Sequence, residues 1–283
     1  MFLRLITSVL ALMVLMMVIT SGNDLAWLVL VSILLWFSFT EWGAFVRFNP
    51  IESKFFAAFG VFSFYSVHSK LEAIEYIPTI LSISVFFWVC LVPFILKGGL
   101  KSLIQEKYLC AFIGWCVLLA AAIAMSYMKL VSVSLLVSVL LITIIADVFA
   151  YVFGKLFGSK KLAEHISPGK TWAGVYGAIL SVLAFNLFIV LYGPVVFQFS
   201  EFDKTWHMLV FKAWPLPIFI IWSIVMVVVG IMGDLFESML KRQAHIKDSG
   251  KMLPGHGGIL DRIDAHIAVL PMAALLAWVP IPA

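Results

Sequence analysis

Residues 218–234 read IFIIWSIVMVVVGIMGD, an apolar run in which Asp234 is the first charged residue. A helix needs about 20 mostly apolar residues to cross the hydrocarbon core of a bilayer. Similar runs recur along the chain, which is 63% hydrophobic and 12% charged, whereas soluble domains are about 45–50% apolar and about 25% charged. The composition therefore predicts an integral membrane protein and excludes a soluble, disordered, collagenous or disulfide-stapled chain.

The expected fold is all-α, a polytopic membrane protein with about nine transmembrane helices. Apolar runs closed by charged residues or by Gly and Pro place the spans near residues 2–20, 25–46, 54–69, 78–96, 109–128, 131–153, 172–197, 216–240 and 265–281. The first is interpreted as a retained helix, because no convincing signal-peptide cleavage site follows it. Segment 54–69 is short, so a tilted or re-entrant segment is the alternative to a full crossing. The segment from Phe197 to Trp214 is expected to be an interfacial loop with aromatic anchors.

Basic residues are unequally distributed between the two sides of this topology. The 19 Lys and Arg residues fall in the N-terminus or in the loops after the second, fourth, sixth and eighth spans, except for Lys70, Lys129, Lys204 and Lys212. Because basic loops stay on the cytoplasmic side, the larger set is expected to face the cytoplasm of a bacterial-type inner membrane. Orientation accounts for the net charge of +4, so no nucleic-acid partner is expected.

Two acidic residues lie at the ends of apolar runs. Asp147 follows residues 140–146, in which Thr143 is the polar exception, and Asp234 follows the apolar run from Ile218 to Met232. An ionised carboxylate within a span costs at least ~2.5 kcal/mol, so such residues normally face a polar cavity or a partner. We interpret both as candidate functional residues, and the alternative for each is a structural ion pair with a neighbouring Lys or Arg. Glu41, within the second span, is interpreted equally as a structural partner or as a functional group.

Helical spacing groups further polar residues with Asp234. Asp234, Ser238, Lys241 and His245 are separated by four, three and four residues, so we expect them to line one stripe of a continuing helix, flanked by Glu237 and Arg242. Residues 254–258 read PGHGG, a run that no regular helix tolerates and whose glycines let backbone N–H groups approach a ligand. Asp261 and Asp264 then lie three residues apart, on roughly one face of the last span.

Several carboxylates beside several Lys and Arg residues indicate phosphate chemistry at the cytoplasmic surface. Mg²⁺ prefers oxygen ligands and usually binds through one or two carboxylates together with substrate phosphates. Cations then neutralise the phosphate charge that builds up in a transition state. His256 is interpreted as a hydrogen-bonded residue of the tight turn, with metal ligation or proton transfer as alternatives. The three cysteines match no metal motif and are expected to be structural.

The segment from Ser238 to Asp264 resembles a known family signature. It comprises Ser238, Lys241 and Arg242, then Lys247 and Asp248, and finally LPGHGGILDRID at residues 253–264. This pattern resembles the signature of phosphatidate cytidylyltransferases, also called CDP-diacylglycerol synthases. A second stretch is similar to the other recurrent segment of that family and includes Asp147, Ala150, Tyr151, Gly154, Lys155, Phe157, Gly158, Ser167, Pro168, Lys170 and Thr171. Gly169 and Ala173 depart from it. The resemblance covers the C-terminal half.

The resemblance implies an enzyme that condenses CTP with phosphatidic acid in the bilayer, releasing diphosphate and CDP-diacylglycerol. It divides the chain into N-terminal transmembrane helices, residues 1–130, and C-terminal catalytic transmembrane helices, residues 131–283. It implies Mg²⁺ ligation by Asp234 and Asp261, with a second cation left open. The implied catalytic residues are Asp234, Ser238, Lys241, Arg242, Asp261 and Asp264. The implied substrate-binding residues are Lys170, Lys247, Asp248, His256, Gly257, Gly258, Arg262, Asp147 and Tyr151.

The sequence leaves two other functions open. The first is a CTP-dependent kinase that phosphorylates an isoprenoid alcohol, which would release CDP and a lipid phosphate. The second is an ion-coupled transporter, because acids within spans often mark ion pathways. Plentiful apolar lateral faces are also compatible with a homodimer, which composition does not establish.

Overall fold

The structure is a computed structural model that describes residues 2–71, 75–99, 103–197, 201–250, 252 and 257–278. Its longer helices are α1 (Phe2–Thr20), α2 (Asp24–Phe45), α3 (Pro50–His68), α4 (Ile77–Phe86), α6 (Lys107–Val131), α7 (Val133–Phe157), α8 (Trp172–Val196), α10 (Leu216–Gln243) and α11 (Leu260–Trp278). The short helices are α5 (Val92–Phe94) and α9 (Trp206–Ala213), with π-helical turns at Phe87–Leu91 and Ile95–Gly99 and 3₁₀ turns at Leu103–Gln105 and Phe202–Lys204. Two strands, β1 (Lys161–Ala163) and β2 (Ser167–Thr171), complete the described chain.

Each predicted span lies on a helix, with boundaries that differ by a few residues. Within the described ranges, six helical segments are long and apolar enough to cross a membrane: Asp24–Phe45, Ile77–Gly98, Lys107–Val131, Val133–Phe157, Trp172–Val196 and Leu216–Gln243. The first five residues of α11 include three charged ones, Asp261, Arg262 and Asp264, which sets this helix apart from the six. The protein is therefore a helical, multi-pass membrane protein.

Polar side chains at the helix ends account for several of the boundaries. Asn49 accepts hydrogen bonds from the N–H groups of Ile51 and Glu52, and the Glu52 carboxylate accepts one from Asn49 N–H, which forms a capping box at the start of α3. Ser132 has an extended backbone that ends α6, and its hydroxyl accepts the N–H of Ser134 at the start of α7. These caps satisfy N–H groups that the first helical turn leaves unpaired.

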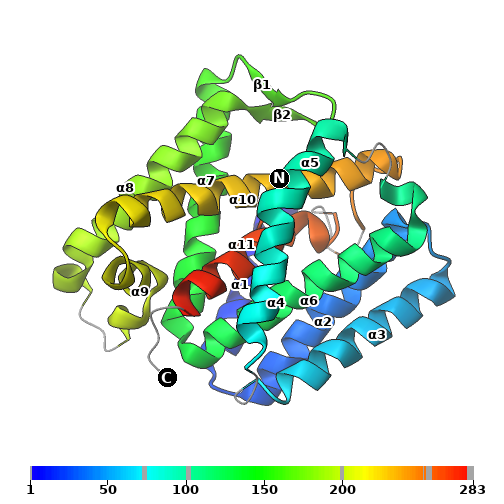
Figure 1. Cartoon of the computed structure of the whole chain (residues 1–283), viewed down its shortest axis with the longest axis horizontal. Coiled ribbons are helices and arrows are strands. Elements are labelled where there is room, and N and C mark those ends of the chain that lie inside the picture. Colours follow the sequence, from blue (N-terminus) through cyan, green and yellow to red (C-terminus); the bar gives the residue numbers. More distant parts are fainter. Residues whose placement is uncertain are drawn as a thin grey trace.

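Helix α11 lies at the centre of the bundle. It packs against α2, α4, α6, α7, α9 and α10, and Figure 1 shows it in the middle of the molecule, with α7 and α8 on one side and α2, α3 and α6 on the other. Most of its residues from Ala265 to Ala277 are buried. A helix that is apolar on all sides belongs in a core, so the first turn of α11 brings its charged residues to the place where the other helices meet.

Two glycines allow α10 and α11 to cross at short range. A Cβ atom at Gly233 would lie 2.6 Å from the carbonyl oxygen of Asp264 and 3.0 Å from Cβ of Ala268. A Cβ atom at Gly230 would lie 3.2 Å from Val269 Cγ2. Small residues at a crossing let the two backbones approach closely, as is common between membrane helices. The crossing sets Asp234, the neighbour of Gly233, beside the first turns of α11.

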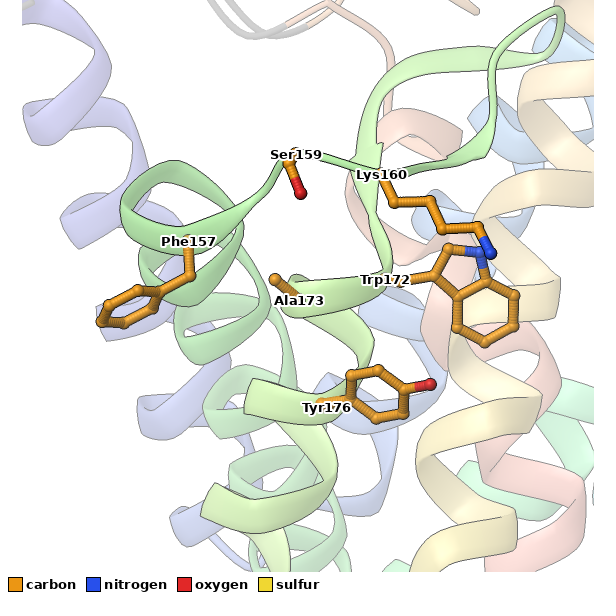
Figure 2. A pocket seen from close by; sticks show the side chains of 6 residues that line it. All are labelled: Phe157, Ser159, Lys160, Trp172, Ala173 and Tyr176. Atoms are coloured by element: carbon orange, nitrogen blue, oxygen red, sulfur yellow. The ribbon is translucent and has the colours of Figure 1, made fainter.

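The structure contains a β-hairpin between α7 and α8, which the all-α prediction did not include. Strands β1 and β2 pair antiparallel, with Lys161 opposite Thr171 and Ala163 opposite Ser167. The two strands have three and five residues, too few to show an alternating pattern in the sequence. A pocket of about 440 Å³ lies at the base of the hairpin, lined by Phe157, Ser159, Lys160, Trp172, Ala173 and Tyr176 (Figure 2).

The expected interfacial loop from Phe197 to Trp214 differs in the structure. Residues 198–200 lie outside the described ranges, and the remainder forms the turn Phe202–Lys204 and helix α9. Trp206 and His207 of α9 are fully buried, and burial lowers the pKa of His207 to about 3. These aromatic rings therefore pack in the core, because α9 turns back against α7, α8 and α11.

Candidate active site

The C-terminal part of α10 carries the predicted polar stripe, shortened by one residue. Ser238 Oγ donates a hydrogen bond to Asp234 Oδ1 over 3.3 Å, and Lys241 lies one turn further along. The prediction that His245 continues the stripe is wrong. Helix α10 ends at Gln243, and His245 has a left-handed backbone (φ 59°) while its N–H donates to the carbonyl of Arg242. A left-handed residue just beyond the helix satisfies its last carbonyl groups and turns the chain away.

Lys170 joins the hairpin to α10. Its Nζ lies 2.6 Å from Asp234 Oδ2, and the two side chains are 24% and 33% exposed. Partial burial weakens solvent screening, so this pair is worth more than an exposed surface ion pair. Of the two interpretations of Asp234, an ion pair with a lysine is therefore realised, but its partner is distant in sequence rather than neighbouring.

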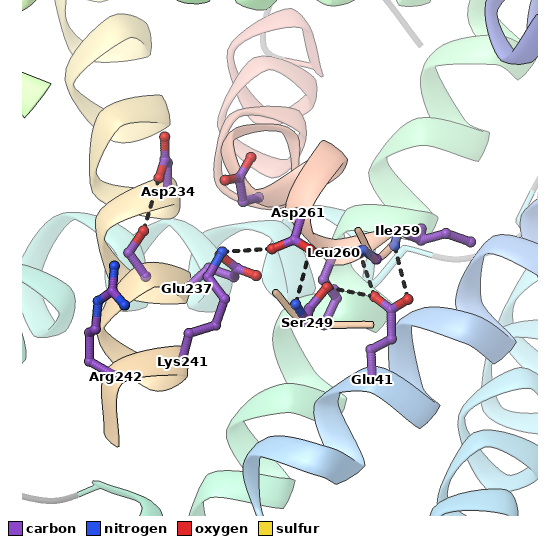
Figure 3. A network of polar contacts seen from close by, with 12 residues as sticks. Glu41, Asp234, Glu237, Lys241, Arg242, Ser249, Ile259, Leu260 and Asp261 are labelled. Atoms are coloured by element: carbon purple, nitrogen blue, oxygen red, sulfur yellow. Dashed lines mark hydrogen bonds and ion pairs between the residues drawn. The ribbon is translucent and has the colours of Figure 1, made fainter. Parts of the chain in front are cut away.

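Lys241 is paired with two carboxylates in a more buried setting. Its Nζ lies 2.6 Å from Asp261 Oδ1 and 2.5 Å from Glu237 Oε2, and the three side chains are 14%, 8% and 4% exposed. The other oxygen of Asp261, Oδ2, accepts the backbone N–H groups of Ser249 and Gly258 at 2.9 and 2.8 Å (Figure 3). Both oxygens of Asp261 are thus occupied, which is what a buried charge requires.

Asp147 of α7 and Asp264 of α11 belong to the same electrostatic group as Asp234. The charges of Asp234 and Lys170 act on both residues, and that of Asp147 acts on Asp264. Three helices therefore contribute carboxyl oxygens around one lysine, and oxygen ligands of this kind suit a bound cation.

Asp147 also lines a mostly apolar pocket between α7, α8, α10 and α11. Other lining residues include Ala146, Gly230 and Ala265. This space is about 20 Å³, room for about one water molecule.

Some predicted site residues lie outside these contacts. Tyr151 is exposed, with Lys155 Nζ 5.9 Å from its ring centroid. Arg242 is exposed, and its Nε donates to the carbonyl of Ile166 in the hairpin loop over 3.3 Å. Lys247 and Asp248 are exposed, and His256 lies outside the described residues. Arg262 is also exposed and follows Asp261 in the first turn of α11.

Gly257 lies directly against the site. Its backbone has φ 90°, and a Cβ atom there would lie 2.6 Å from Asp261 Oδ2 and 3.4 Å from Asp248 Cβ. A side chain at this position would meet both the strained backbone conformation and the Asp261 carboxylate. The glycine-rich run therefore does allow close approach of the backbone to a carboxylate.

Sequence reasoning missed Ser249 and left Glu41 undecided. Glu41 Oε2 accepts hydrogen bonds from Ser249 Oγ and Leu260 N–H, and Oε1 accepts Ile259 N–H. These contacts hold the residues before α11 at the edge of the site. The signal was a lone acid in an apolar run, as for Asp147; Ser249 carries no comparable signal.

Asp234 and Asp261 supply oxygen ligands of the kind that Mg²⁺ prefers. Each already has a lysine ammonium group beside it, so a bound Mg²⁺ would have to displace that ammonium group or share the carboxylate with it. Among the residues that the structure describes, no group of three or more His, Cys, Asp or Glu side chains is arranged to hold a metal ion. One or two carboxylates completed by substrate phosphates are the usual magnesium arrangement, and the residues present fit it.

The fold and the site together define an integral membrane protein with paired carboxylates and lysines at the meeting point of its C-terminal helices, a setting suited to a cation and an anionic substrate. The chain matches the model of the cytidylyltransferase family over residues 2–279, and it belongs to that family.

Similar proteins from several bacteria are named phosphatidate cytidylyltransferase. The chain is 40% identical to the one from Haemophilus influenzae over 114 residues, which cover 40% of this chain and 35% of that protein. It is 39% identical to the Pseudomonas aeruginosa protein over 121 residues, 43% of this chain and 39% of that protein. It is 42% identical to the Staphylococcus epidermidis protein over 121 residues, 42% of this chain and 39% of that protein. The matched segment thus spans little more than a third of these relatives.

Proposed function

We propose that the protein is a phosphatidate cytidylyltransferase, which converts CTP and phosphatidate into CDP-diacylglycerol and diphosphate. The observation that carries the proposal is the pair of contacts Lys170–Asp234 and Lys241–Asp261 where α10 and α11 meet, in a chain of the cytidylyltransferase family. The names of the relatives supply the substrate.

The reaction is a nucleotidyl transfer. An oxygen of the lipid phosphate forms a bond to the α-phosphorus of CTP, and the bond from that phosphorus to the oxygen bridging to the β-phosphate breaks, releasing diphosphate. The lipid phosphate is already an oxyanion, so no strong general base is needed. The barrier lies in bringing two anions together and in the charge on the departing diphosphate.

The residues of the site are suited to lowering that barrier. Lys170 and Lys241 hold positive charge against the carboxylates in a partly buried setting, where electrostatic interactions are stronger than in water. Asp234 and Asp261 would hold Mg²⁺, which when bound supplies further neutralisation of phosphate charge. Ser238, bonded to Asp234, and Asp264 would complete the surroundings of the reacting phosphates.

Phosphatidate would reach the site from the side, with its acyl chains in the membrane, while CTP would arrive from the cytoplasm. In this proposal the chain crosses the inner membrane nine times, and the loops that carry Lys170 and Lys247 face the cytoplasm.

The proposal is tested with purified protein, radiolabelled CTP, phosphatidate and Mg²⁺, with and without a chelator. We expect chelator-sensitive formation of CDP-lipid, and a loss of at least about 100-fold in kcat for Asp234→Asn and Asp261→Asn, the size that removal of transition-state charge stabilisation usually has. Asp203→Asn is the control, because Asp203 pairs with Lys212 in an exposed ion pair outside the site. Near-normal turnover of either site variant would refute the metal assignment, and CDP with a lipid phosphate as products would identify a lipid kinase instead.

A further inference from the structure

Glu41 of α2 is a buried carboxylate that accepts hydrogen bonds from three neutral donors. It is 7% exposed, and it accepts Ile259 N–H at Oε1 over 2.9 Å, and Leu260 N–H and Ser249 Oγ at Oε2 over 2.8 and 2.9 Å. Among the described residues no Lys or Arg forms an ion pair with it. A buried carboxylate is costly unless its oxygens are hydrogen-bonded. The three donors therefore fix the position of the Glu41 carboxylate, and the carboxylate in turn fixes the positions of the donors.

The two backbone donors lie at the start of α11. Leu260 is the first residue of the helix and Ile259 precedes it, so both N–H groups lack intrahelical partners. A negative charge is also favourable at a helix N-terminus. Glu41 therefore serves α11 as a capping residue that comes from another helix, more than 200 residues earlier in the chain.

The described residues of the loop before α11, 249–250 and 257–259, also bind Asp261. Ser249 donates its hydroxyl to Glu41 and its N–H to Asp261 Oδ2, and Gly258 N–H donates to Asp261 while the next N–H, of Ile259, donates to Glu41. Figure 3 shows these contacts running from Glu41 through Ser249 to Asp261 and on to Lys241. The loop therefore donates hydrogen bonds to both Glu41 and Asp261. Because Ser249 binds both carboxylates, a shift that breaks its bond to Glu41 also disturbs its bond to Asp261.

Two glycines, Gly250 and Gly258, lie in close contact with the Glu41 carboxylate. A Cβ atom at Gly250 would lie 2.4 Å from Glu41 Oε1, and one at Gly258 would lie 2.5 Å from Glu41 Oε2 and 2.0 Å from Ser249 Oγ. These distances are far below van der Waals contact, so the loop backbone is fitted directly against the carboxylate.

We infer that Glu41 is a positioning residue of the active site: through Ser249 and the N–H groups of Ile259 and Leu260 it holds the loop in the form that presents Asp261 to Lys241. The inference rests on the proposed function for its catalytic consequence. It assigns part of the active-site geometry to the second helix of the chain, far in sequence from the residues of the family signature.

The test is Glu41→Gln in the full-length protein. One amide NH₂ must then face a backbone N–H, so at least one contact is lost with little change in shape. We expect kcat for CDP-lipid formation to fall about tenfold or more, equivalent to the loss of one charge-assisted hydrogen bond, with the KM for phosphatidate changed less than about twofold. Amide hydrogen exchange at Ser249, Gly258, Ile259 and Leu260 should become about tenfold faster or more, while exchange within α8 stays unchanged.

Glu52→Gln is the matched control. Glu52 also accepts a backbone N–H at a helix start, but it caps α3 and pairs with Lys107. We expect this variant to keep wild-type kcat and wild-type exchange at the loop. Unchanged kcat and loop exchange in Glu41→Gln would overturn the inference, and so would faster exchange that is equal in the loop and in α8, because that outcome indicates general support of the fold.

A second variant, Ser249→Ala, removes the hydroxyl donor alone and keeps the N–H that binds Asp261. We expect a smaller loss, about twofold to fivefold in kcat, with faster exchange confined to the loop. The double variant should lose less than the product of the two single losses, because both changes act on hydrogen bonds of the same side chain; losses that multiply fully would overturn the route through Ser249. If the wild-type protein makes no CDP-lipid, the proposed function fails, and the exchange experiment still decides whether Glu41 holds the loop.

Discussion

Lys170 and Asp234 form an ion pair that lies beside two further carboxyl groups. Their ion pair is about two-thirds buried, and Asp234 shares its surroundings with Asp147 and Asp264. Without the lysine, three carboxylates would repel one another in a setting of reduced dielectric constant. The pair therefore matters both for the site and for the stability of the carboxylates themselves.

Replacement of the lysine by a neutral side chain of similar length tests this interpretation. We expect Lys170→Met to lower kcat/KM for CTP about 30-fold, which corresponds to a loss of ~2 kcal/mol for one partner of a partly buried pair. The measurement is steady-state kinetics with saturating phosphatidate. Lys161→Met is the control, because Lys161 lies exposed on the other strand of the same hairpin. Equal effects of the two substitutions would show that general positive charge, rather than the contact with Asp234, is what matters.

At the scale of elements, the crossing of α10 and α11 positions the site. Asp234 and Asp264 come from different helices, and they are neighbours because Gly230 and Gly233 allow the helices to approach closely. Alanine favours a helix over glycine by about 1 kcal/mol, so propensity alone would make either glycine a poor choice. Their presence indicates that backbone contact outweighs helix propensity at this crossing.

Alanine substitutions at Gly233, Gly230 and Gly169 test this role of the crossing, because the space available for a Cβ atom increases in that order. At Gly233 the new Cβ atom would meet the Asp264 carbonyl at 2.6 Å, at Gly230 it would meet Cγ2 of the Val269 side chain at 3.2 Å, and at Gly169 it would meet nothing within 4 Å. We expect Gly233→Ala to be destabilising, because overpacking costs about 1–3 kcal/mol and exceeds the gain in helix propensity. Gly230→Ala should be near neutral and Gly169→Ala neutral.

The series is measured as the Tm of the purified protein in detergent together with kcat. Gly233→Ala is expected to lower Tm by several degrees, since about 1 kcal/mol shifts Tm by roughly 2–4 °C in a larger domain. It should also lower kcat, because the shift falls on the backbone of Asp264. A Tm for Gly233→Ala at or above that of Gly230→Ala would contradict the proposed role of the crossing.

At the scale of the whole molecule, orientation in the membrane follows from charge. Lys161 and Lys204 are exposed residues on predicted opposite sides, the first in the hairpin and the second in the turn Phe202–Lys204. Cytoplasmic loops carry an excess of Lys and Arg, and the hairpin belongs to the basic set. We therefore expect the hairpin to face the cytoplasm and the turn to face the opposite side.

Cysteine labelling in intact cells measures this orientation. Cys90, Cys110 and Cys116 are first replaced, because Cys90 is exposed and would itself react. We expect a membrane-impermeant thiol reagent to label Lys204→Cys in intact cells and to label Lys161→Cys only after permeabilisation. The reverse pattern would invert the topology and place the proposed CTP site outside the cytoplasm.

Local properties of the chain predicted much of the architecture. Apolar length predicts helices because a span must satisfy its backbone hydrogen bonds internally, and all nine predicted segments lie on helices. Spacing along one helix likewise predicted that Asp234, Ser238 and Lys241 share a face, since that geometry involves no other element. His245 fell outside the prediction because the end of a helix depends on a single left-handed residue that its periodicity does not reveal.

The sequence by itself determined a helical membrane protein of the cytidylyltransferase family, with nearly half of its charged residues in residues 147–170 and 234–264. Only the tertiary structure decided which charges meet: Lys170 with Asp234, Lys241 with Asp261, and Glu41 with the loop before α11. These partners are 64, 20 and 218 residues apart, and their contacts depend on how closely the helices cross and on where a loop is capped. Such contacts arise from packing between elements, which no periodicity within one element encodes.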